Sequence, residues 1–126
     1  MKSTEWLVTG ALLIYTATLA AETNPYRGTW HLSTVSKKGI SREGTVVIKD
    51  QDGTWKTSSI SVKNPCAGIL APLVIKETSS DGLVFEITKS KALRGCEDNI
   101  ATLKRINETT LQGGLEDGRK LTLVRE

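Results

Sequence analysis

From residue 30 onward, apolar and polar residues alternate along short segments, which is the pattern of β-strands that are buried on one face. In the segment LVFEIT at residues 83–88, for example, Leu83, Phe85 and Ile87 face one way and the residues between them face the other. No stretch of helical length after residue 20 places apolar residues at i, i+3, i+4 and i+7. The alternation therefore predicts an all-β domain.

Turn sequences rich in Asp, Asn and Gly separate about eight such segments. The turns are expected at residues 50–53, 79–82, 107–108 and 116–118. The strands are expected at residues 30–36, 45–50, 55–62, 73–78, 83–88, 101–106, 109–115 and 119–125. This regular spacing is typical of an antiparallel meander, and closure into a small barrel removes the two exposed edges of an open sheet. A β-sandwich is the alternative architecture.

The N-terminus has the pattern of an export signal. Trp6–Ala20 is an uncharged, mostly apolar run, and Thr18 and Ala20 are small residues at the −3 and −1 positions of a cleavage site. The run is shorter than the roughly 20 residues that a transmembrane helix needs. We expect residues 1–20 to be a signal peptide and residues 21–126 to be a single secreted or periplasmic β-barrel domain, without stable membrane insertion after cleavage. An uncleaved anchor is the alternative.

The two cysteines, Cys66 and Cys96, both follow this signal. An even pair in a small exported chain predicts one disulfide, and closing a loop of about 30 residues stabilises a fold by roughly 3–4 kcal/mol in the chain-entropy model. His31 is the single histidine, and no Cys-x-x-Cys spacing occurs. One histidine and two cysteines that are expected to be bonded to each other do not supply the ligands of a metal site. We therefore expect no metal and no cofactor.

Charge and aromatic content disfavour a nucleic-acid partner. The net charge is +3, and the lysines are scattered among the expected strands. Recognition of single strands needs clustered aromatic residues with basic neighbours. After the signal the aromatic residues are only Tyr26, Trp30, Trp55 and Phe85. We therefore expect no nucleic-acid binding.

The first and last expected strands carry a matching pair of residues. Gly28-Thr29-Trp30 begins the first strand, and Arg125 at the end of the last strand is in phase with Leu121 and Leu123, so that its side chain points inward. If these strands pair antiparallel, Arg125 lies beside Trp30. A guanidinium over an indole ring contributes about 0.5–2 kcal/mol.

The Gly-x-Trp motif resembles the signature of the calycin group, which includes lipocalins, avidins, fatty-acid-binding proteins and small secreted inhibitors of bacterial metalloproteases. In those barrels the Trp lies at one end, and an Arg from the last strand packs across its ring. The resemblance implies a closed barrel whose floor is formed by Gly28, Trp30 and Arg125. In length and in its single disulfide, this chain is most similar to the metalloprotease-inhibitor branch.

No residues form a catalytic pattern. If Trp30 faces inward, His31 faces outward, and no Gly-x-Ser-x-Gly motif is present. The adjacent carboxylates at 97–98 and 116–117 are typical of turns rather than of a glycosidase pair. We expect that the protein is not an enzyme.

Two loops are the candidate binding surface. Residues 64–72 display an apolar pair between two prolines, and residues 89–96 carry three positive charges. The expected disulfide holds both loops side by side, as a preorganised and partly apolar surface that suits a protein partner. The alternative is a purely structural crossover with a half-buried apolar lid. The candidate partner-binding residues are Ile69, Leu70, Lys89, Lys91 and Arg94.

These observations predict a non-catalytic secreted or periplasmic binding protein that recognises another protein, in the manner of an inhibitor. The alternative function is a carrier of a small hydrophobic ligand inside a lipocalin-like barrel. The few aromatic residues and the small size favour the first, because a barrel of this length is filled by its own side chains.

Overall fold

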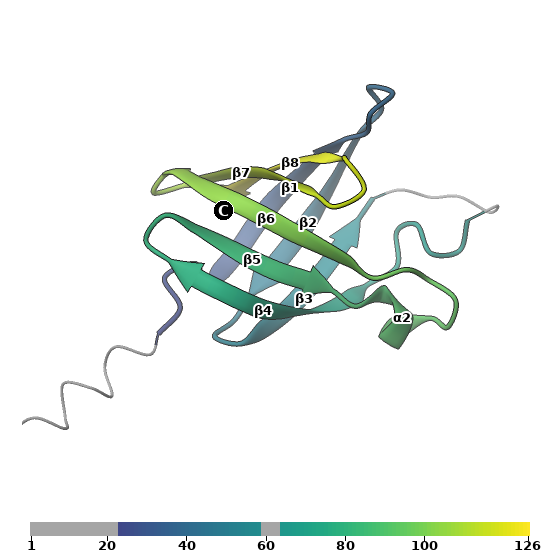
Figure 1. Ribbon diagram of the computed structural model, residues 1–126, viewed down its shortest axis with the longest axis horizontal. Helices are drawn as coiled ribbons and strands as arrows, with labels where there is room; N and C mark the ends of the chain where they lie inside the picture. The colour runs from purple at the N-terminus through teal and green to yellow at the C-terminus, as the bar shows by residue number, and fades with distance from the viewer. Residues whose placement is uncertain (1–22, 59–63) are drawn as a thin grey trace, which may run out of the picture.

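The first and last strands pair with each other, and this pairing closes an antiparallel sheet into a barrel (Figure 1). The computed structural model describes residues 23–58 and 64–126. The strands are β1 (Gly28–Val35), β2 (Ser41–Ile48), β3 (Asp52–Thr57), β4 (Ala71–Ser79), β5 (Gly82–Ile87), β6 (Asn99–Asn107), β7 (Thr110–Leu115) and β8 (Lys120–Arg125). Each strand pairs with the next along the chain. The predicted all-β, antiparallel, closed barrel is confirmed, and the sandwich alternative is wrong.

The structure differs from the sequence prediction in three main features, two strand boundaries and one short helix. β2 begins at Ser41, four residues earlier than expected, because residues 41–44 pair with β1 although their side chains are polar on both faces. β3 ends at Thr57; the expected strand continued to residue 62, and residues 59–63 lie outside the described residues. A four-residue helix, α2 (Lys89–Ala92), interrupts the connection from β5 to β6. It is too short and too polar to have an apolar periodicity.

The predicted disulfide is also confirmed. Cys66 and Cys96 are bonded with a Cα–Cα distance of 5.6 Å. The bond joins the β3–β4 connection to the β5–β6 connection. Figure 1 shows these two connections and α2 at one end of the barrel, and the tips of the β4–β5 and β6–β7 hairpins at the other end.

The barrel interior is filled by the chain's own side chains. Trp55 and Phe85 contact each other in a tilted arrangement, with ring centroids 6.3 Å apart. The largest fully buried side chains are Trp30, Trp55, Phe85, Leu32, Ile48, Leu73, Leu83, Ile87, Leu111, Leu121, Leu123 and Val46. Burial of this apolar surface is the main stabilising contribution to the fold.

Gly113 lies at a point where two strands approach each other closely. It pairs with Leu103 of β6 and Leu121 of β8, and a Cβ atom at this position would lie 1.9 Å from the Thr102 carbonyl oxygen. A side chain at residue 113 is therefore incompatible with the curvature of the sheet. Glycine at such positions allows strands to bend and the barrel to close.

We predict that Gly113→Ala destabilises the barrel by about 1–3 kcal/mol, because the added methyl group forces backbone movement in a closed sheet. Gly114→Ala is the matched control: it lies next to Gly113 in β7, and the nearest atom to its new Cβ would be 3.1 Å away. Urea unfolding of both variants checks this. Equal stabilities for the two variants would contradict the proposed role of Gly113.

Candidate functional site

The segment before β1 seals one end of the barrel, which we call the closed end. Asn24 and Tyr26 are both buried there. The Asn24 side chain donates to the Lys49 carbonyl at 3.1 Å and accepts from the Tyr26 backbone N–H at 2.8 Å. The Tyr26 hydroxyl donates to the Ser79 carbonyl in β4. These bonds fix the segment across the end of the barrel, because its buried polar groups are satisfied by two different hairpins.

Arg125 also holds this segment in place, through contacts of its guanidinium group. Its guanidinium lies 4.3 Å from the centroid of the Trp30 ring, and Trp30 and Arg125 are paired in the β1–β8 register. Its Nη1 and Nη2 donate to the carbonyl oxygens of Arg27 and Pro25, at 2.7 and 3.1 Å. The charged group thus stacks on the indole and caps two loop carbonyls at once.

Gly28 lies at the same place and completes the motif. Its φ of +138° is a conformation that side-chain-bearing residues rarely adopt, and a Cβ atom would lie 3.1 Å from Arg125 Nη1. The Trp30 Nε1–H donates to the Tyr26 carbonyl at 2.9 Å. The structure therefore brings Gly28, Trp30 and Arg125 together at the closed end. Trp30 and Arg125 contact each other there and hydrogen-bond to the segment before β1.

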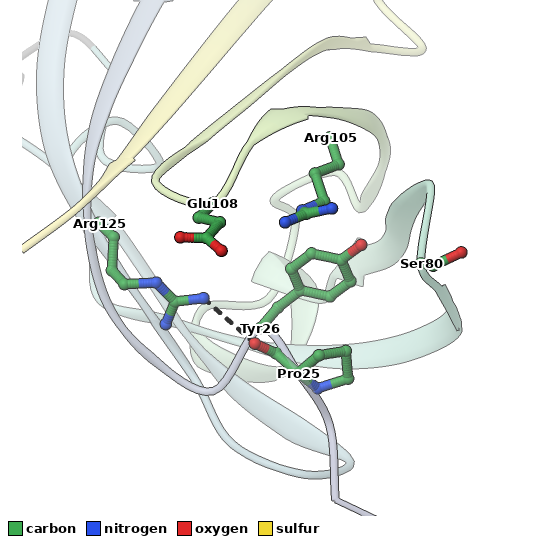
Figure 2. A pocket seen from close by; sticks show the side chains of 6 residues that line it. All are labelled: Pro25, Tyr26, Ser80, Arg105, Glu108 and Arg125. Carbon is green, nitrogen blue, oxygen red and sulfur yellow. Dashed lines mark hydrogen bonds between the residues drawn. The ribbon is translucent and has the colours of Figure 1, made fainter.

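A shallow cavity of about 410 Å³ lies on the rim of the closed end (Figure 2). It is lined by Pro25, Tyr26, Ser80, Arg105, Glu108 and Arg125. Burial raises the pKa of the Tyr26 phenol, and the nearby Arg105 opposes this effect. In Figure 2 the Glu108 side chain lies between the two arginine side chains. The sequence pattern does not indicate this cavity, because Arg105 and Glu108 belong to the β6–β7 hairpin, whose sequence is that of an ordinary polar turn.

The opposite end, which we call the loop end, carries the predicted binding residues. The disulfide joins its two main connections, and the Thr88 backbone N–H donates to the Pro72 carbonyl at 2.9 Å. Leu70 and Leu93 are 59% and 38% exposed, so that each connection presents one large apolar side chain to solvent. Ile69 is half-buried, in contrast to the open display expected from the sequence.

The charged residues of the loop end divide into two groups. Lys91 and Arg94 are exposed, whereas Lys89 is half-buried. The loop that carries them is fixed by Asp98, which accepts hydrogen bonds from the backbone N–H and the hydroxyl of Ser90 at 2.9 and 3.0 Å. These bonds lower the pKa of the Asp98 carboxyl. The surface is therefore ordered by covalent and polar contacts rather than by a hydrophobic core of its own.

A polar cavity of about 310 Å³, which we call the basic cavity, lies between the connections of the loop end. Its lining residues are Ser36, Arg42, Thr57, Asn64, Ala67, Lys89 and Arg119. Burial lowers the pKa of the Lys89 ammonium, and Arg119 lowers it further, while Asp117 acts in the opposite direction. Of the cavity's cations, sequence reasoning selected only Lys89; Arg42 lies in β2 and Arg119 in the β7–β8 turn, both far from Lys89 along the chain.

The described residues show neither a metal cluster nor a membrane-spanning helix. In residues 23–58 and 64–126, no group of three His, Cys, Asp or Glu side chains is placed to hold a metal ion. The same part of the chain has no helix that is long and apolar enough to cross a membrane. His31 lies on the outer wall, where it contacts Glu43 in an exposed ion pair.

Comparisons with known proteins show the fold. The chain matches no protein-family model, and no curated protein is similar to it. A redesigned β-barrel is 20% identical with a TM-score of 0.54, covering 81% of this chain and 92% of that one. A de novo designed fluorescence-activating β-barrel is 18% identical with a TM-score of 0.52, covering 80% and 94%. These similarities show a small antiparallel β-barrel and do not establish membership of the calycin group.

We predict that Arg125→Ala lowers the stability of the barrel by about 1–3 kcal/mol, because it removes the stacking on Trp30 and two charge-assisted hydrogen bonds. Val124→Thr is the control: it changes the neighbouring residue, which is exposed on the outer wall, and keeps the β-branched shape. Thermal unfolding of both variants checks this. An unchanged melting temperature in Arg125→Ala would show that the closed end does not depend on this residue.

Proposed function

We propose that this chain is a non-catalytic secreted or periplasmic binding protein that recognises a protein partner through its loop end, in the manner of an inhibitor. The observation that carries the proposal is the disulfide between two connections that each expose a large apolar residue, Leu70 and Leu93. Hydration of exposed apolar side chains is unfavourable, and contact with a partner would remove their surface from water.

The exposed charges support a protein as the occupant. Lys91 and Arg94 lie in the same connection as Leu93, so that the apolar residues have a cationic rim. Protein interfaces combine apolar anchors at the centre with polar and Arg residues around them. Because the disulfide and Asp98 already order these loops, binding loses less conformational entropy than it would with mobile loops.

The proposal includes a relationship to the calycin group, and the arrangement of residues at the closed end supports it. Arg125 over Trp30, with Gly28 beside them, is the arrangement that the resemblance implies for those barrels. The expected signal peptide at residues 1–20 lies outside the described residues, and export remains part of the proposal; a disulfide is compatible with an oxidising compartment.

A carrier of a small hydrophobic ligand is the second candidate. The buried Trp55 Nε1–H has no hydrogen-bond partner among the described residues, and such a group favours a polar atom of a bound molecule or a water beside it. Against a carrier, Trp30, Trp55 and Phe85 themselves occupy the interior of the barrel. We therefore rank protein binding first.

We predict that the double variant Leu70→Ser, Leu93→Ser weakens partner binding by at least about tenfold, since both apolar anchors are lost. The matched control is Ile106→Ser, Val124→Ser, which removes two exposed apolar residues away from the loop end. Immobilised wild-type and variant proteins are exposed to the secreted or periplasmic fraction of the source, and retained proteins are identified and titrated. A protein retained equally by both variants would contradict binding through the loop end.

Native mass spectrometry of the protein purified from its source distinguishes the two candidates. A mass that begins at Ala21, with the disulfide formed and nothing else attached, agrees with protein binding. A stoichiometric small adduct that is lost on denaturation would favour the carrier instead, and Trp55 would then be the first residue to substitute.

A further inference from the structure

The basic cavity of the loop end holds a cation, Lys89, that makes no direct ion pair among the described residues. Among residues 23–58 and 64–126, the Lys89 ammonium makes neither a hydrogen bond nor an ion pair. It is half-buried, and Arg119 lies close enough to lower its pKa by charge repulsion. Removing an ammonium from water beside another cation costs free energy, and the Coulomb attraction of an anion in the cavity offsets this cost.

The nearest carboxylate does not fill this role. Asp117 lies 2.9 Å from Arg119 Nη2, and it also accepts from Asn99 Nδ2 at 2.9 Å. Burial raises the pKa of Asp117, but these hydrogen bonds outweigh the burial and lower it overall. Asp117 therefore orients Arg119 at the cavity wall, and it leaves Lys89 without a direct partner.

Two other lining residues carry hydroxyl groups. Ser36 Oγ accepts from the Ile40 backbone N–H at 3.0 Å, which leaves its hydroxyl proton to donate elsewhere. The Thr57 side chain lines the same cavity. A group that only accepts hydrogen bonds and carries negative charge is complementary to such a lining.

We propose that the basic cavity binds a carboxylate of the protein partner, either an acidic side chain or a C-terminal carboxylate. This inference rests on the proposed function, and it names the chemical group that the loop end recognises. The carboxylate neutralises Lys89 inside the cavity, while Leu70 and Leu93 contact apolar residues around the acidic group. Recognition then requires an acidic residue with apolar neighbours, which gives the site its specificity.

The test is an NMR titration of the amide signals with three probes. N-acetylglutamate N-methylamide presents a side-chain carboxylate, N-acetylalanine presents a terminal carboxylate, and inorganic phosphate presents an anion that is not of protein type. We expect saturable shifts at Ser36, Thr57, Lys89 and Arg119 with at least one carboxylate probe, and the stronger probe identifies the source of the group. Stronger binding of phosphate, or an absence of saturable shifts, would overturn the proposal.

Lys89→Gln and Lys104→Gln form a matched pair, because both remove one positive charge and Lys104 is an exposed residue of β6 outside the cavity lining. We expect carboxylate affinity to fall about tenfold or more in Lys89→Gln, as for loss of a charge-assisted hydrogen bond, and to stay within about twofold in Lys104→Gln. The melting temperature of Lys89→Gln should equal or exceed that of the wild type, since the repulsion from Arg119 is relieved. Equal losses of affinity in the two variants would overturn the assignment to the cavity.

Partner capture separates this inference from the function on which it rests. A partner that is lost by Leu70→Ser, Leu93→Ser and also by Lys89→Gln supports both proposals. A partner that is lost by the leucine variant and retained by Lys89→Gln overturns the cavity's role alone. Saturable carboxylate binding together with equal capture by every variant would overturn the function assigned to the loop end.

Discussion

Closure of the sheet through the pairing of β1 with β8 is the constraint on which the rest of the structure depends. Without it, an eight-stranded sheet presents two edges to solvent and leaves its inner face partly uncovered. Arg125 contributes twice to this closure, because it lies over Trp30 within the strand pair and donates to Arg27 and Pro25 outside it. One side chain thus couples the last strand, the first strand and the segment that seals the closed end.

This arrangement separates the two ends of the barrel by role. At the closed end, the polar groups of the buried residues Asn24 and Tyr26 are satisfied by hydrogen bonds within the chain. At the loop end, the connections expose Leu70 and Leu93, and Lys89 makes no direct ion pair among the described residues. The interior is filled by the chain's own side chains, which is why we propose binding at the loop end.

The sequence predicted those features that a local pattern encodes. Alternation located all eight strands because their inner faces are apolar, and the Gly-x-Trp motif and the phase of Arg125 indicated the closed end. The early start of β2 was missed because Ser41, Arg42 and Glu43 are polar on both faces. The basic cavity was missed for a different reason: its cations come from β2, α2 and the β7–β8 turn, and only closure of the barrel brings them to one place.

Lys89 supports the proposed binding surface over a purely structural crossover. A crossover that served only to staple two loops would gain stability from an uncharged residue at this position, because the ammonium is partly desolvated and repelled by Arg119. Folded proteins tolerate such locally unfavourable charges mainly at functional sites, where a ligand supplies the missing interaction. The disulfide adds the rigidity that a small cavity needs, since Cys66 and Cys96 lie in the two connections that border it. An unfavourable charge held in a reinforced cavity is more consistent with recognition than with stapling alone.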